Sequence, residues 1–200
     1  MGRSLPSRET FSQTSPDRSF EIKTRKESEE VFFVVDPLVK VDASTIVSLK
    51  EQSARNSRQR SRLCTHHSPL DDVHEMFIVH HKGIYVHPHM HVCKNESIHV
   101  IEGLVDMVVF DDEGAVIDVI EMGDYASGKI FYYRLPELQF HTLLIRSTDL
   151  VFHEVTKGPF RLADTVWAPW APKEFELDQV TEYACSLERL VGDFKEEYRG

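Results

Sequence analysis

Two histidines separated by a single residue, His89 and His91, are the first residues in this sequence whose types and spacing suggest chemistry. Side chains alternate between the two faces of a β-strand, so both imidazoles point to the same side and can reach one metal ion. Glu96 can add a carboxylate oxygen across a short loop, and His141 offers a third imidazole farther along the chain. These ligands suit a divalent transition metal ion (Zn, Mn, Fe, Co, Ni or Cu) and leave coordination positions open for water or substrate.

Histidine is concentrated around this pair, since nine of the eleven histidines lie within residues 66–99. Strand alternation predicts that Tyr85 and His87 face the same side as the metal ligands, provided that Pro88 introduces no bulge. We therefore predict Tyr85 and His87 as catalytic residues, because an imidazole with a pKa of about 6.5 suits proton transfer at neutral pH. The alternative for His87 is a position at the rim of the site.

Positive charge gathers in one arginine-rich stretch that contains Arg58, Arg60 and Arg62. Arginine binds phosphate and carboxylate well, so these residues are predicted to bind an anionic substrate group, and the alternative is a solvated connector. The whole chain carries a formal charge of −10, which disfavours nucleic acid as a partner. Two tryptophans among prolines, Trp167 and Trp170, either stack on a sugar ring or close one end of the fold.

The composition predicts a soluble, cytoplasmic protein that does not interact with a membrane. The 200 residues suffice for one domain with a single core. The longest unbroken apolar stretch, residues 31–35, is far shorter than the roughly 20 residues of a membrane span, and the first thirty residues do not resemble a signal peptide. The three cysteines, Cys64, Cys93 and Cys185, are widely spaced, which fits a reducing compartment.

Short strands separated by turn signals dominate residues 75–156 and predict an all-β fold. The expected strands are Met76–His80, Ile84–His91, Ser97–Ile101, Leu104–Phe110, Ala115–Glu121, Lys129–Leu135, His141–Arg146 and Leu150–Val155. An earlier strand is expected over Val31–Val35, for which the edge of a sheet is one option.

Helices are predicted only before and after these strands. A short helix begins at Asp42 or Ser44 and runs into the arginine-rich stretch. Apolar residues recur at spacings of three and four from Leu177 to Tyr198, which predicts an amphipathic helix that packs on the strands or at a dimer interface. The predicted organisation is therefore a flexible tail (1–30), a β domain (31–175) and a C-terminal helix (176–200).

The metal-site residues resemble the first sequence motif of the cupins, a family built on a double-stranded β-helix. Five residues stand at the spacing of that motif: Gly83, His89, His91, Glu96 and Gly103. The resemblance implies a small β-barrel and one divalent metal ion held by His89, His91, Glu96 and His141.

A second cupin motif is less complete in this sequence. Pro136 and His141 keep the family spacing, whereas Leu138 and Ile145 stand where Gly and Asn are usual, and the gap from Gly123 to Pro136 is long. The resemblance therefore places His141 slightly less securely than the other three ligands.

Residues 58–174 also resemble one cupin group, the WbuC-type cupin-fold metalloproteins. The resemblance is carried by His67-Ser68-Pro69 with Asp71-Asp72, Tyr85 with Pro88-His89-x-His91, Phe110-Asp111-Asp112-x-Gly114, His141-Thr142, Gly158-Pro159 and Ala168-Pro169-Trp170-Ala171-Pro172. It implies a bacterial protein of surface polysaccharide metabolism, such as O-antigen of lipopolysaccharide, with a poorly defined reaction.

Two functions follow as hypotheses from the site and the resemblance. In the first, the protein is a metal-dependent isomerase, hydrolase or oxygenase that acts on a sugar or a sugar-derived acid. In the second, it is a non-catalytic module that uses the metal to bind or sense a small carbohydrate-like or anionic ligand. We also predict a homodimer in which the strand near Val31 makes the contact.

Overall fold

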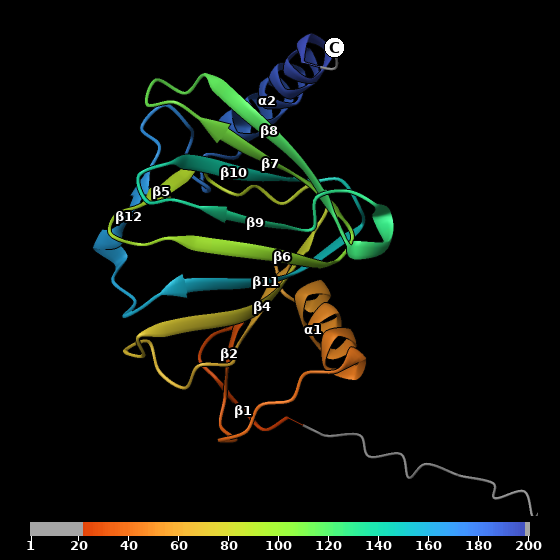
Figure 1. Ribbon diagram of the computed structural model, residues 1–200, viewed down its shortest axis with the longest axis vertical. Coiled ribbons are helices and arrows are strands. Elements are labelled where there is room, and N and C mark those ends of the chain that lie inside the picture. The colour runs from red at the N-terminus through yellow and green to blue at the C-terminus, as the bar shows by residue number, and fades with distance from the viewer. Residues whose placement is uncertain (1–21, 199–200) are drawn as a thin grey trace, which may run out of the picture.

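Two β-sheets lie face to face in the computed structural model, which describes residues 22–198 (Figure 1). In spatial order, the larger sheet contains β1 (Thr24–Lys26), β2 (Val31–Val34), β3 (Arg60–Cys64), β4 (Val73–His81), β11 (Asp149–Lys157), β6 (Glu96–Glu102) and β9 (Tyr132–Leu135). The smaller sheet contains β12 (Thr165–Trp167), β5 (His89–His91), β10 (Phe140–Ile145), β7 (Leu104–Phe110) and β8 (Val116–Gly123).

The strand order confirms the predicted all-β, cupin-type fold. Within the larger sheet the run β4, β11, β6, β9 faces the run β5, β10, β7, β8 of the smaller sheet, and all of these neighbours are antiparallel. From β4 to β12 successive strands alternate between the sheets, except for the hairpin of β7 and β8 within the smaller sheet, which is the jelly-roll or double-stranded β-helix arrangement. Among the described residues the two sheets are separate and are linked at one corner by a single isolated bridge, from Met122 to Ile130. The predicted barrel is therefore an open, two-sheet sandwich.

Apolar side chains from both sheets form the central core. The largest fully buried members are Phe152, Ile78, Met107, Met122 and Leu150. Burial of side chains this large stabilises each sheet against the other. The core therefore fixes the ends of the strands that carry the candidate site.

Helix α1 (Ala43–Arg55) covers the outer face of the larger sheet (Figure 1). Asp42 caps its first turn by accepting a hydrogen bond from the Thr45 backbone N–H at 2.9 Å. Ile46 and Leu49 are buried on the sheet surface. The helix ends at Arg55, where the arginine-rich stretch begins as predicted, and the later part of that stretch is strand β3.

Helix α2 (Leu177–Glu197) lies on the outer face of the smaller sheet. Leu187 and Val191 are buried against Val108 and Phe110, while Leu177 and Tyr198 at the two ends of the predicted stripe are exposed. The amphipathic helix is thus present, and only its central part is covered. Neither helix of residues 22–198 is long and apolar enough to cross a membrane.

One prediction about the tail and two about strands differ from the structure. Thr24–Lys26 pairs with Val31–Val34, so the structured part begins inside the predicted tail, and β2 lies between two strands and not at an edge. Residues 1–21 of that tail lie outside the described residues. The expected strand over Ile84–His91 is limited to His89–His91, since Pro88 has no N–H for a ladder.

Candidate metal centre

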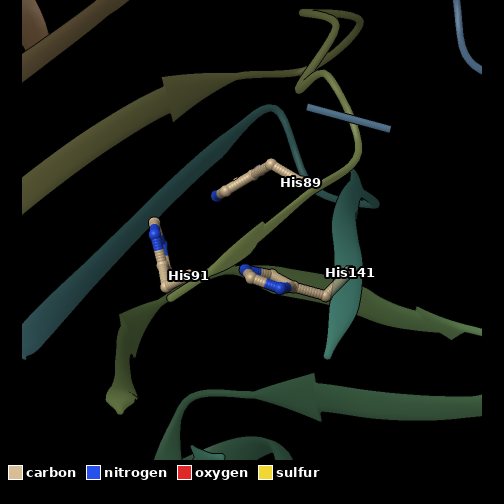
Figure 2. A group of neighbouring side chains, drawn as sticks. All are labelled: His89, His91 and His141. Atoms are coloured by element: carbon tan, nitrogen blue, oxygen red, sulfur yellow. The ribbon is translucent and has the colours of Figure 1, made fainter. Parts of the chain in front are cut away.

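Three imidazoles converge between the sheets. His89 and His91 project from β5 and His141 projects from β10, in which it is the register partner of His89. One ring nitrogen from each residue lies within 4.8 Å of the others. Figure 2 shows the three side chains arranged around a common space. Because these ligands come from two strands, the ladder between β5 and β10 sets the spacing between the rings.

Hydrogen bonds donated to backbone carbonyl oxygens orient two of the rings. Nδ1 of His89 lies 2.9 Å from the carbonyl oxygen of His87, and Nδ1 of His141 lies 3.0 Å from that of Gln139. A carbonyl oxygen only accepts, so in both rings Nδ1 carries the hydrogen and Nε2 faces the cluster. His91 has a weaker contact, 3.4 Å from Nδ1 to Thr165 Oγ1. This is the outer-shell arrangement that prepares an imidazole to bind a metal ion.

Glu96 joins the cluster from the first position of β6. Its two carboxylate oxygens lie 3.2 Å from His91 Nε2 and 3.1 Å from His141 Nε2, and the Tyr133 hydroxyl donates to it at 2.9 Å. Burial alone would raise the pKa of Glu96, but the neighbouring imidazoles hold it well below its usual range. The Glu96 carboxylate in turn raises the pKa of His141 against the opposing effect of burial.

The donor set fits a divalent transition metal ion. Three imidazoles and one ionised carboxylate are ligands that Zn, Mn, Fe, Co, Ni and Cu accept. The Nε2 atoms of His91 and His141 lie within hydrogen-bond distance of Glu96, so a bound ion would replace any proton shared between these atoms. The structure thus brings together the four predicted ligands, and their binding of metal stays a prediction.

The predicted catalytic residues Tyr85 and His87 do not join this cluster. The Tyr85 hydroxyl donates to the carbonyl oxygen of Pro172 at 2.8 Å, and His87 Nε2 lies 3.4 Å from the carbonyl oxygen of Ala168. Ile84 and Val86 pack against the central core in their place. Residues 84–88 are irregular up to Pro88, so the alternation of β5 does not extend to them.

The three arginines of the predicted anion site have different surroundings. Arg58 and Arg60 both form ion pairs with Glu30 and Glu174, among them Arg58 to Glu174 at 2.5 Å. Arg62 lies between Ser61 and Leu63, which face α1, and therefore projects toward the interior between the sheets. Two of the three charges are thus neutralised within the chain, and anion binding by these residues stays a prediction.

Glu154 is a site residue that the sequence reasoning missed. It follows the buried Leu150 and Phe152 on the same face of β11, and it interacts electrostatically with Glu96, His91, His141 and Arg62. Burial and the Glu96 charge raise the pKa of Glu154 to about 7. The alternation along the expected strand Leu150–Val155 was the available signal, because it points Glu154 inward.

The residues that follow Glu96 on β6 alternate between the two faces of the strand, as predicted. Ile98 and Val100 are buried in the central core, and His99 is exposed on the opposite face. The sequence could not indicate strand β12, which pairs with β5 and brings Thr165 opposite His91 and Trp167 opposite His89.

Comparison with known families gives one match. A family model described as "Domain of unknown function (DUF6016)" matches residues 41–122, less than half of the chain. The matched part contains His89, His91 and Glu96 and ends before His141. A comparison with curated proteins gives no match.

Several solved structures resemble part of this fold. The capsular polysaccharide assembling protein CapF from Staphylococcus aureus is 20% identical over 56% of this chain and 32% of its own, with a TM-score of 0.45. An oxalate decarboxylase variant from Bacillus subtilis is 16% identical over 48% of this chain and 24% of its own, with a TM-score of 0.41.

The oxalate decarboxylase of Lactobacillus farciminis, solved as a formate complex, is 15% identical over 48% of this chain and 27% of its own, with a TM-score of 0.40. The Bacillus subtilis enzyme contains Mn(II) centres. The matched parts thus span about a quarter to a third of those proteins. The strand order, and not these partial matches, assigns the fold of this chain.

Proposed function

We propose that this protein binds one divalent transition metal ion through His89, His91, His141 and Glu96 and presents it to a small carbohydrate-like or anionic ligand. The observation that carries the proposal is the convergence of three imidazoles, two of which are fixed by backbone carbonyls so that Nε2 faces the cluster. Fixed imidazoles of this kind stabilise a bound ion because little orientation is lost on binding.

We favour an enzyme over a non-catalytic binding module. A bound ion supplies Lewis-acid polarisation of a carbonyl or hydroxyl oxygen. Glu154 faces the same interior, and its raised pKa of about 7 allows the carboxyl group to hold or release a proton near neutral pH. Tyr133 holds Glu96 in place through its hydroxyl. A module that only binds or senses a ligand needs no proton carrier beside the metal ligands.

The biological setting is proposed from the resemblance to WbuC-type proteins alone. It is the metabolism of a bacterial surface polysaccharide such as O-antigen, with a sugar or sugar-derived acid as the substrate. The identity of the metal decides the class of reaction, because iron favours oxygen chemistry, whereas zinc or manganese favours isomerisation or hydrolysis.

The test is the metal content of the protein after chelation and reloading. Wild-type protein should retain about one ion per chain by elemental analysis and should melt at a higher temperature with metal than without, because the ion binds only the folded state. A variant with both His89→Ala and His91→Ala should lose the ion and this shift. His99→Ala is the matched control, since His99 is exposed on the other face of β6. Equal metal content in the double variant and the control would remove the proposal.

A further inference from the structure

The two tryptophans of the chain have different environments. Trp170 packs among Phe110, Phe140 and Tyr183, and Gly114 lies so close to its ring that a Cβ at that position would meet it at 2.7 Å. Trp167 is 49% exposed although its ring is large and apolar. Trp170 therefore closes the outer core under α2, whereas Trp167 is available to a ligand.

The position of Trp167 is fixed beside the candidate metal centre. In the ladder between β12 and β5 it is the register partner of His89, and the centroids of their rings are 5.5 Å apart. Its ring also lies 5.1 Å from that of His87 and is nearly parallel to it, with an interplanar angle of 28°. The indole is thus held by packing on two imidazoles, one of which belongs to the metal cluster.

Other groups at this end of the fold extend the surface around the cluster. Leu138, which is 57% exposed, donates a backbone hydrogen bond to the carbonyl oxygen of His91 at 2.8 Å. Thr165 places its hydroxyl near His91, and Glu154 adds a carboxyl group on the interior side. The surface around the cluster is therefore apolar at its rim, at Trp167 and Leu138. Farther in it carries the oxygen atoms of Thr165 and Glu154 and the metal-binding cluster.

We propose that Trp167 is the platform on which a pyranose ring lies while hydroxyl oxygens of that ring reach the metal held by His89, His91 and His141. This inference rests on the proposed metal-binding function. One face of a pyranose presents C–H groups that pack on an indole, while the hydroxyls at its edge can bind an ion or oxygen-containing side chains. The oxygen atoms of Thr165 and Glu154 favour a hydroxyl-rich ring over a purely aromatic one.

The placement of Trp167 beside the metal ion can be tested with the metal and without a sugar. Addition of Cu²⁺, which quenches indole emission at short range, should quench the fluorescence of a Trp170→Phe variant, in which Trp167 is the remaining tryptophan. The same addition should quench a Trp167→Phe variant much less. Equal quenching of the two variants, with equal copper bound, would overturn the placement beside the ion.

Calorimetry on the Zn²⁺-loaded protein tests the platform itself. The probes are methyl glycosides of glucose, galactose and mannose, together with glucuronate, and 3,4-dihydroxybenzoate serves as the aromatic comparison. At least one sugar should bind, and Trp167→Ala should weaken it roughly tenfold, because the stacking contact is lost. Trp167→Phe should retain most of the affinity since it keeps an aromatic face, and Trp170→Phe should bind as wild type does.

The possible outcomes separate the platform from the metal site. If wild-type protein binds no Zn²⁺, the proposed function fails and the platform fails with it. If all variants retain Zn²⁺ and Trp167→Ala binds the sugar as wild type does, only the platform is wrong. Binding of dihydroxybenzoate with no binding of any sugar at tens of millimolar would overturn the assignment of a pyranose.

Discussion

His80 is a buried histidine on the inner face of β4, away from the metal ligands. Its ring packs edge-on against Phe152, and its Nδ1 atom is buried without a hydrogen-bond partner among the described residues. Burial, aided by the nearby positive charge of Arg62, lowers the pKa of His80 to about 3. The folded protein therefore keeps this imidazole neutral at pH values at which the unfolded chain would protonate it.

This lowered pKa predicts a loss of stability in mild acid. Because the folded pKa lies below the unfolded value of 6.5, the contribution is present above pH 6.5 and declines below it. Between pH 7 and pH 5 the unfolding free energy of the metal-free protein should fall by about 2 kcal/mol more in wild type than in His80→Leu. Urea denaturation at a series of pH values measures both curves, and parallel curves would contradict the prediction.

Glu154 should show the opposite dependence. Its folded pKa of about 7 lies above the unfolded value of 4.5, so the folded protein holds a proton that the unfolded chain has lost. As pH rises from 4.5 to 7, metal-free wild type should lose up to about 3 kcal/mol of stability relative to Glu154→Gln. The same denaturation series tests this, and a variant that loses stability in step with wild type would show that Glu154 titrates normally.

At the scale of elements, α2 is held by two buried side chains and by ion pairs of Lys195 and of Glu188, which pairs with Arg146 at 2.6 Å. Leu187 and Val191 fit against the smaller sheet, and Lys195 donates to Asp106 at 2.7 Å and to Glu121 at 2.9 Å. The helix has no side-chain cap at its N-terminus. Its attachment therefore depends mainly on packing, as is usual for amphipathic helices.

The contribution of packing to the attachment of α2 can be measured by replacing a leucine with alanine at a buried and at an exposed position of the helix. Leu187→Ala should reduce the unfolding free energy by about 3 kcal/mol, because it leaves a cavity beside Val108 and Phe110. Leu190→Ala is the matched control on the same helix, and its 50% exposure predicts a change below about 0.5 kcal/mol. Equal losses in urea denaturation would mean that α2 is not held through this face.

The elements show which features a sequence can reveal. Alternation placed His89, His91, Ile98 and Val100 correctly, because each lies in a regular strand. It failed at Tyr85 and His87, where Pro88 ends the regular ladder. Periodicity also located α2, since its spacing is a local property of the helix.

The partners of charged residues could not be predicted in this way. Arg58 pairs with Glu174, which is 116 positions away in sequence, and no local pattern announces such a contact. Trp167 likewise gains its place only because the three-residue strand β12 pairs with β5. Both features depend on the tertiary arrangement and not on local spacing.

At the scale of the whole molecule, the homodimer predicted from the sequence stays a prediction. The strand Val31–Val34, which was expected to make the contact, lies between β1 and β3, so its backbone is already paired on both sides. Among the described residues the edges of the larger sheet are β1 and β9, and exposed aromatic residues, Tyr132 and Phe131, lie at or next to β9. Edges of this kind invite pairing between copies.

Light scattering at micromolar concentration should therefore give a mass of twice the 23.1 kDa of one chain. Leu190→Ala should have the same mass, because Leu190 lies on α2, which the structure packs against its own smaller sheet. A wild-type protein that stays at the mass of one chain over the whole concentration range would refute the dimer.

The pairing of β5 with β10 also sets the time at which the metal cluster can form. His89 and His91 are about fifty positions from His141 in sequence, so no local segment contains the complete set of ligands. Contacts between such distant segments form late in folding, because closing the intervening chain costs entropy. An ion added during refolding should therefore be captured no faster than β5 pairs with β10 in the smaller sheet, so the rate of metal uptake reports on a late step of folding.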